Sequence, residues 1–144
     1  MSFLGSIDVS GSGLTAQRLI MDLISNNIAN VNTTRTPEGG PYQRQVAVFT
    51  AKSPKFTIPG LENDAPVLQQ GVEVTSIVKE NSAPRLVYNP QHPDANARGY
   101  LALPNVNVVT EMVDMIAATR AYEANATSIA SAKSMALKAL EIGK

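Results

Sequence analysis

The prolines of this chain are confined to its middle, and this distribution limits the possible folds more than any other feature. All nine prolines lie between Pro37 and Pro104, and the segments on either side contain none. Because proline removes a backbone donor and clashes with the preceding helical turn, it is excluded from helix interiors. The chain of 144 residues therefore divides into two ends that are each able to form a long helix, and a middle of turns and short strands.

Apolar side chains in the N-terminal segment follow two neighbouring helical stripes. One stripe alternates steps of three and four residues, as a coiled-coil seam does, and comprises Leu14, Gln17, Met21, Ile24, Ile28 and Val31. The other stripe comprises Leu19, Leu23, Asn26 and Asn30. The pattern predicts a helix over residues 12–31. Residues 1–11 form a less regular extension of it, because Gly11 and Gly13 weaken its start.

The C-terminal segment also has two stripes, and it predicts a longer helix over residues 107–142. Asn107 follows the last proline and is a suitable N-cap. The first stripe comprises Val108, Met112, Met115, Thr119, Tyr122, Ala126, Ile129, Lys133, Ala136 and Leu140. The second comprises Ala118, Ala121, Asn125, Ser128, Ala132, Met135, Ala139 and Ile142, whose small side chains allow another backbone to approach closely.

The middle of the chain has the composition of short strands. Residues 43–49 and 71–78 alternate in polarity and are rich in β-branched side chains, and residues 85–88 are expected to pair with 71–78 across the turn at 81–84. Residues 54–66 are expected to form an exposed loop, and residues 89–105 an irregular one. The predicted fold class is α+β: the terminal helices pair as an antiparallel coiled-coil hairpin. Residues 1–34 and 105–144 form a discontinuous helical domain, and residues 35–104 form a β-rich segment.

Two apolar stripes on one helix require two sets of neighbours. A second stripe left in water would expose about four large side chains, each worth roughly 1.5–3 kcal/mol when buried. That sum is comparable with the roughly 5–15 kcal/mol that stabilises a whole domain. Other copies or other chains are therefore expected to cover it; the alternative is a monomeric helical hairpin capped by the β segment. The expected interface residues are Leu14, Leu19, Met21, Leu23, Ile24, Asn26, Asn27, Ile28, Asn30, Val31, Met112, Met115, Ile116, Tyr122, Asn125, Ile129, Met135 and Leu140.

Three asparagines interrupt the N-terminal stripes. A buried amide without partners costs about 1–3 kcal/mol, so Asn26, Asn27 and Asn30 need hydrogen-bond partners if they are buried. A polar residue within a coiled-coil seam fixes register and partner number. The hypothesis is that these amides set how the helix meets its neighbours, with Asn26 the strongest candidate and Asn125 or Asn107 as partners. The alternative is that Asn27 or Asn30 only ends the helix.

Composition excludes most kinds of chemistry. Twelve basic and twelve acidic residues balance, so no nucleic-acid partner is indicated, and the absence of cysteine removes thiolate chemistry and disulfides. The only histidine, His92, has no second histidine for a metal and no nucleophile partner. Residues 94–99 resemble the start of a calcium loop, but Arg98 and Asn105 occupy ligand positions, so a turn is expected. We expect no catalytic residue, metal, cofactor or small-molecule substrate; a small enzyme or metal module centred on His92 and Asp94 is the disfavoured alternative.

Several motifs resemble those of a known family. SNNIANVNTT at residues 25–34 is similar to the N-terminal signature of flagellar axial proteins of the rod and hook. EMVDMI at 111–116 and RAYEAN at 120–125 resemble their C-terminal signature. Between them lie LVYNP at 86–90, HPDAN at 92–96 and PNVN at 104–107, and with the short length these are most like a proximal-rod member. Asn89 and Leu103 depart from the pattern, where an acid and Met are usual, and residues 50–70 carry least of it.

The resemblance implies a structural subunit of the hollow rod that transmits torque through the periplasm. It also implies export by the flagellar type III apparatus without a cleaved signal. This replaces the cytoplasmic location that a first basic residue as late as Arg18 suggests, since a Sec signal needs a positive start. The implied partners are copies of itself, other rod proteins, the export apparatus and the membrane-ring base. A coiled-coil adaptor or scaffold outside the flagellum is the alternative function.

Overall fold

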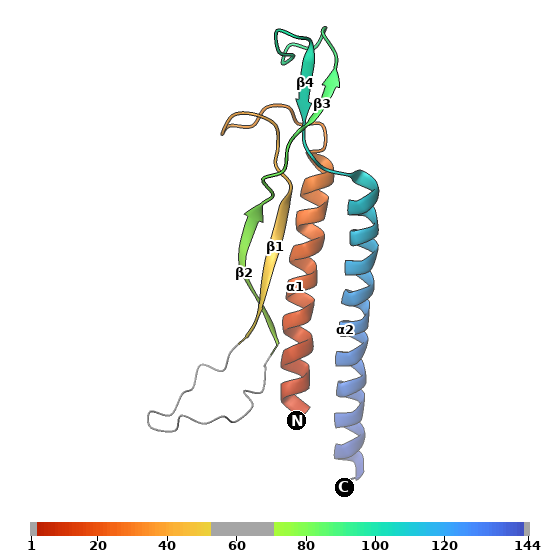
Figure 1. Ribbon diagram of the computed structural model, residues 1–144. Coiled ribbons are helices and arrows are strands. Elements are labelled where there is room, and N and C mark those ends of the chain that lie inside the picture. Colours follow the sequence, from red (N-terminus) through yellow and green to blue (C-terminus); the bar gives the residue numbers. More distant parts are fainter. Residues whose placement is uncertain (1–2, 53–70, 143–144) are drawn as a thin grey trace, which may run out of the picture.

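Two long helices and two antiparallel strand pairs make up the computed structural model, which describes residues 3–52 and 71–142 (Figure 1). The helices are α1 (Phe3–Ala29) and α2 (Val108–Ile142). The strands are β1 (Gln45–Ala51), β2 (Val72–Lys79), β3 (Arg85–Tyr88) and β4 (Tyr100–Leu103). The α+β class is confirmed. The loop expected at residues 54–66 lies outside the described residues.

The two helices lie side by side and run in opposite directions (Figure 1). They pack through a narrow line of mostly small side chains, and the buried apolar residues on them are Ala16, Leu23, Ile24, Ala118 and Ala132. Small side chains such as alanine allow two helix backbones to approach closely at their contact. Within the described residues, neither helix combines the length and apolar character of a membrane span.

Asn107 begins α2 as the sequence predicts. Its side-chain Oδ1 accepts a hydrogen bond of 3.0 Å from the backbone nitrogen of Val109, and its carbonyl accepts one of 3.0 Å from Glu111. This is the N-cap geometry that satisfies amide groups otherwise left without partners at a helix start. The N-terminal extension is also helical, because α1 begins at Phe3 rather than Ser12, and it ends at Ala29, two residues earlier than expected.

The predicted pairing of the strands is wrong in one respect. β2 pairs with β1, not with β3, and β3 pairs with β4. Because β1 and β2 are both long, their pairing joins seven residue pairs, whereas β3 has only four residues to offer. β4 falls in the stretch expected to be irregular: it is a four-residue strand bounded closely by glycine and proline, so its alternation is too short to detect.

The β1–β2 pair runs alongside α1 and is attached to it near Gly71 (Figure 1). Ser12 on α1 donates a 2.7 Å hydrogen bond to the carbonyl of Val9, and its Oγ accepts a 3.0 Å bond from the backbone nitrogen of Val72. Gly71 has a φ of +95°, and a Cβ there would collide with the Ser12 side chain. Glycine is therefore required at the start of β2 for both its backbone angle and its lack of a side chain.

Candidate functional site

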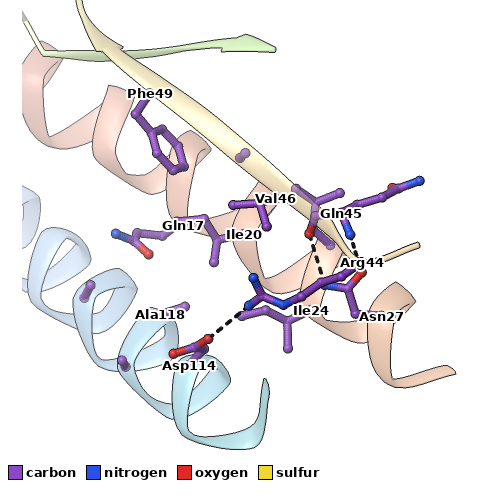
Figure 2. A pocket seen from close by; sticks show the side chains of 14 residues that line it. Gln17, Ile20, Ile24, Asn27, Arg44, Gln45, Val46, Phe49, Asp114 and Ala118 are labelled. Atoms are coloured by element: carbon purple, nitrogen blue, oxygen red, sulfur yellow. Dashed lines mark hydrogen bonds and ion pairs between the residues drawn. The ribbon is translucent and has the colours of Figure 1, made fainter. Parts of the chain in front are cut away.

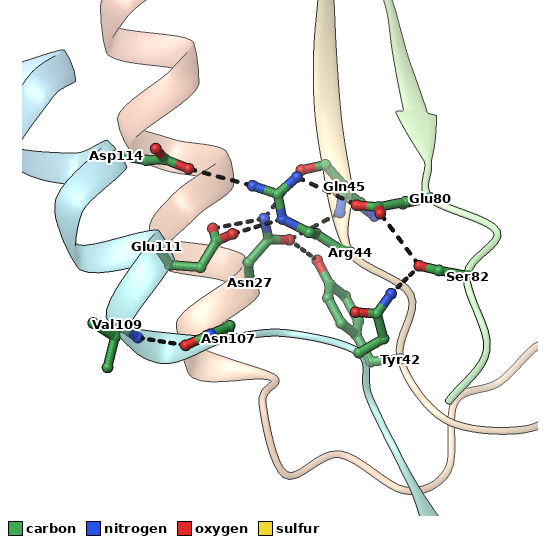
Figure 3. A network of polar contacts seen from close by, with 11 residues as sticks. Asn27, Tyr42, Arg44, Gln45, Glu80, Ser82, Asn107, Val109, Glu111 and Asp114 are labelled. Atoms are coloured by element: carbon green, nitrogen blue, oxygen red, sulfur yellow. Dashed lines mark hydrogen bonds and ion pairs between the residues drawn. The ribbon is translucent and has the colours of Figure 1, made fainter. Parts of the chain in front are cut away.

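Asn27 connects three elements of the fold through a fully used side chain (Figure 3). Its amide nitrogen donates to the carbonyl of Gln45 and to Oε2 of Glu111, both at 3.0 Å. Its amide oxygen accepts from the hydroxyl of Tyr42 and from the backbone nitrogen of Gln45, both at 2.9 Å. The residue is 1% exposed. An asparagine side chain has two donors and two acceptor positions, so this one is saturated.

Glu111, also 1% exposed, brings the first turn of α2 to the same point. Its Oε1 accepts a 2.6 Å charge-assisted hydrogen bond from Nε of Arg44. Arg44 also reaches Glu80 at 3.3 Å and Asp114 at 3.4 Å, so it links the start of β1, the end of β2 and α2. We call the group Asn27, Tyr42, Arg44 and Glu111 the polar clasp. Because a buried carboxylate is stable only when paired and hydrogen-bonded, the clasp depends on all its members.

Two pKa values respond to this environment. Burial alone lowers the pKa of Arg44, but the hydrogen bond and charge of Glu111, and those of Glu80, raise it overall. Burial first, and the Glu111 carboxylate second, raise the pKa of Tyr42 above its ordinary value. Both shifts favour the protonated forms, which are the forms that donate to Glu111 and Asn27.

A groove of about 420 Å³ lies between α1, β1 and α2 (Figure 2). Arg44, which belongs to the clasp, and Asp114 lie at one end of it. The other lining side chains are mostly apolar: Ile20, Leu23, Ile24, Val46, Phe49, Ala117, Ala118 and Ala121. In the described part of the chain, no group of three or more His, Cys, Asp or Glu residues could hold a metal ion.

The opposite face of α2 carries a stripe of uncovered apolar side chains. Val109 is 70% exposed, Met112 55%, Val113 60% and Ile116 61%. Their spacing of three, four and seven residues from Val109 places them on one side of the helix, away from buried Glu111 and Ala118. We call these four residues the outer stripe. Exposed apolar patches of this kind mark interaction sites in proteins.

The structure distributes the 18 expected interface residues over three environments. Leu23, Ile24 and Asn27 are buried inside the subunit. Nine are half-buried, namely Leu14, Leu19, Met21, Ile28, Asn30, Val31, Met115, Asn125 and Ile129. Six are exposed, namely Asn26, Met112, Ile116, Tyr122, Met135 and Leu140. The buried three contact their own chain, so they are not free to meet another subunit in this conformation.

The three asparagines lie in different environments in the structure. Asn27, not Asn26, is the buried amide, because it lies on the side of α1 that faces both β1 and α2. Asn26 is exposed, and its carbonyl and side-chain oxygens accept from the amide of Asn30 at 2.9 and 3.0 Å. Asn30 in turn accepts a 3.1 Å bond from Thr33, so it shapes the end of α1 as the alternative interpretation proposed.

Sequence reasoning missed Tyr42, Arg44, Val109 and Val113 as site residues, and it included Glu111 only within the motif EMVDMI. A signal for Glu111 was present: it lies seven residues before Ala118, which is on the small-residue stripe of α2. No comparable signal marks Tyr42 or Arg44, because they lie outside the helices and reach the clasp only through the fold.

The loop around His92 forms local hydrogen bonds. The backbone nitrogen of Asp94 donates to Nδ1 of His92 at 3.1 Å, and Oδ2 of Asp94 accepts from Thr34 at 2.8 Å. Oδ1 of Asn96 accepts from the backbone nitrogens of Arg98 and Tyr100, both at 2.9 Å. Residues 94–99 therefore form the expected turn, closed by side-chain-to-backbone bonds.

Two family models match the ends of the chain. Residues 7–35 match the family described as flagella basal body rod protein. Residues 97–142 match the family described as flagellar basal body rod FlgEFG protein C-terminal. The two matches include most of α1 and α2, the helices that bear the clasp residues Asn27 and Glu111.

Curated relatives match over the full length. The chain is 52% identical to the flagellar basal-body rod protein FlgC of Borreliella burgdorferi, with 99% of this chain and 98% of that protein covered. It is 43% identical to FlgC of Bacillus subtilis and 35% identical to FlgC of Escherichia coli O6:H1, with both chains completely covered in each case. The chain belongs to the FlgC family of flagellar basal-body rod proteins.

Proposed function

We propose that this chain is a structural subunit of the bacterial flagellar basal-body rod, and that the outer stripe of α2 is one of its assembly surfaces. The observation that carries the second part is the exposure of Val109, Met112, Val113 and Ile116 on one helix face. Full burial of each such side chain contributes roughly 1.5–3 kcal/mol. Together they offer a neighbour a stabilisation comparable with that of a small domain, about 5–15 kcal/mol.

The assembly surface proposed here is narrower than the set expected from the sequence. It keeps the apolar and aromatic side chains among the exposed members, Met112, Ile116, Tyr122, Met135 and Leu140, leaves out the exposed Asn26, and adds Val109 and Val113. It leaves out Leu23, Ile24 and Asn27, whose burial within the subunit gives them a structural role. The half-buried members keep some exposed surface that a neighbouring subunit can cover.

The finer architecture follows from the same contacts. The helices pair as an antiparallel coiled coil, with residues 1–34 and 105–144 as the helical domain and residues 35–104 as the β-rich segment. Support comes from Asn27 and Glu111, which join the two ends of the chain, and from Arg44, which ties the middle segment to them. In the rod, such helices stack with copies of the chain and with other rod proteins, and they transmit torque through close packing.

The route to the rod is part of the proposal. The family relationship supports passage through the flagellar type III export apparatus and attachment near the membrane-ring base in the periplasm. A chain without cysteine forms no disulfide that would oppose passage in an unfolded state. The rival function, an adaptor outside the flagellum, is disfavoured by full-length relatives that are named as rod proteins.

Complementation of a strain that lacks this chain tests the proposal. The variant Val113→Asp with Ile116→Asp places two charges on the outer stripe at positions that are already exposed, so the fold is retained. It is expected to abolish motility and to leave basal bodies without complete rods. The control, Val113→Leu with Ile116→Leu, keeps the stripe apolar and is expected to restore motility. Normal rods with the aspartates would contradict the proposed surface, and motility in the strain without the chain would contradict the rod function.

A further inference from the structure

The two helices meet in one constant register along their shared length. Four pairs of residues, one from each helix, mark this register. From one pair to the next, the position on α1 decreases by seven and the position on α2 increases by seven. Asn27 bonds Glu111, and Ile20 lines the same groove as Ala118. Gly13 lies against Asn125, and Ser6 lines the same shallow pocket as Ala132. A repeat of seven on both helices is the periodicity of a coiled coil.

Three of these four layers contain a polar side chain, and in two of them the contact between the helices is a hydrogen bond or a close steric fit. In one layer the Asn27 amide donates to the Glu111 carboxylate at 3.0 Å, with both residues buried. In the other, the Asn125 amide fills the space left by the missing side chain of Gly13. A Cβ at Gly13 would lie 2.9 Å from Nδ2 of Asn125, closer than side chains approach.

We propose that these two polar layers, Asn27–Glu111 and Gly13–Asn125, select the antiparallel register of the helix pair. A shift of seven residues one way would place the Glu111 carboxylate against Ile20, where it has no partner. A shift the other way would place Asn125 against Ile20, where there is no space, and Asn27 against an alanine. The two polar layers thus act against both neighbouring registers.

The remaining layers cannot make this choice. Ala118 and Ala132 are equivalent small side chains, each seven residues from Asn125, and either would accept Ile20 as a neighbour. Burial of apolar area is non-directional and discriminates poorly between such arrangements. The inference concerns the single subunit, so it does not depend on the proposed rod function.

A pair of introduced cysteines reports the register, because the natural chain contains none. Gln17→Cys with Ala121→Cys joins residues that line the same groove in the observed register. Ser10→Cys with Ala121→Cys joins residues that meet only after the shift of seven that places Glu111 against Ile20, which is about 10.5 Å along a helix. With a short thiol-specific cross-linker, the first pair is expected to react within the isolated chain and the second to remain unreacted.

The decisive variant replaces one polar layer with apolar side chains, Asn27→Leu with Glu111→Leu. The rate of cross-linking of the shifted pair is expected to rise at least about tenfold, because the layer no longer opposes a slide. Asn26→Leu with Thr110→Leu also introduces two leucines, at neighbouring exposed positions, and is expected to leave the shifted pair unreacted. A folded clasp variant that cross-links only through the observed pair would overturn the proposal.

A second pair of variants decides the question if the leucine variant fails to fold. Asn27→Asp alone places a second carboxylate against that of Glu111. The repulsion between them is expected to raise cross-linking of the shifted pair. Adding Glu111→Gln exchanges amide and carboxylate across the layer and is expected to return the rate to that of the parent. A rise in shifted cross-linking that the exchange does not reverse would contradict a register role for this layer.

Discussion

Asn27 on α1 donates a 3.0 Å hydrogen bond to Glu111 on α2, across 84 residues of sequence, and both side chains are almost completely buried. This contact joins the end of one helix to the beginning of the other. It also places the Glu111 carboxylate within 2.6 Å of Nε of Arg44, which belongs to the connection into β1. The helix pair and the β1–β2 pair are consequently fixed to each other at one point.

Replacement of Asn27 by alanine tests how far the fold depends on this contact. The change leaves the Gln45 backbone groups, the Tyr42 hydroxyl and one Glu111 oxygen without their partner. Each buried group left unsatisfied costs about 1–3 kcal/mol, so the free energy of unfolding should fall by at least about 3 kcal/mol. Asn26→Ala removes the adjacent, exposed amide and should change it by less than about 1 kcal/mol. Equal effects in urea unfolding would contradict the assignment of Asn27 as the central residue.

Arg44 and Arg120 provide a comparison between a buried and an exposed ion pair. Arg44→Leu leaves the Glu111 carboxylate buried without its counter-ion and should destabilise the fold by about 3–5 kcal/mol. Arg120 pairs with Glu123 at 3.1 Å on the exposed surface of α2, and Arg120→Leu should cost at most about 1 kcal/mol. Thermal unfolding followed by circular dichroism measures both. A cost for Arg44→Leu as small as that for Arg120→Leu would show that water, not Arg44, stabilises the carboxylate.

Two glycines of α1 should respond in opposite ways to the same substitution. Gly11 has open space around it, so Gly11→Ala should stabilise the helix by about 0.5–1 kcal/mol. Gly13→Ala brings a methyl group against Asn125, so its gain in helix propensity should be lost to the displaced side chain. In an Asn125→Ala background the same change at Gly13 should stabilise. Stabilisation by Gly13→Ala in the parent chain would show that the helices can separate there without cost.

The raised pKa of Tyr42 predicts that the free energy of unfolding changes at alkaline pH. Burial and the charge of Glu111 raise the pKa of Tyr42 in the folded chain above the unfolded value of about 10. Its contribution is therefore fully present below about pH 10 and is lost as the pH rises through the folded value, because the phenolate cannot donate to Asn27. The difference in unfolding free energy between the parent and Tyr42→Phe should shrink across that range. A difference that stays constant or grows would contradict the hydrogen bond.

The sequence predicts the parts of this fold that depend on periodicity, and it misses those that depend on contacts between distant segments. The proline-free ends predict both helices, and the Asn107 cap predicts where α2 begins, because these features depend on local chemistry. The pairing of β3 with β4 was missed because β4 is too short to show alternation. The clasp was missed because Tyr42 and Arg44 reach Asn27 only once the chain has folded.

The exposed surface of α2 was also predicted only in part, because periodicity does not show which side of a helix its partner covers. Two apolar stripes on the C-terminal helix predicted uncovered surface, and uncovered surface is present. The sequence could not show which stripe faces α1, because the small residues that allow close approach and the large ones that remain exposed alternate around the same helix. Val109 and Val113 were therefore left out of the expected interface, although they are among its most exposed members.

Thiol labelling at position 116 tests most directly whether the outer stripe of α2 is covered only in the assembled rod. Ile116→Cys should react quickly with a maleimide in the isolated chain, where the side chain is 61% exposed, and at least about tenfold more slowly in purified basal bodies. Ile24→Cys is buried within the subunit and should react slowly in both states. Equal labelling of Ile116→Cys in the isolated chain and in basal bodies would contradict the account, because the outer stripe would then remain in water after assembly.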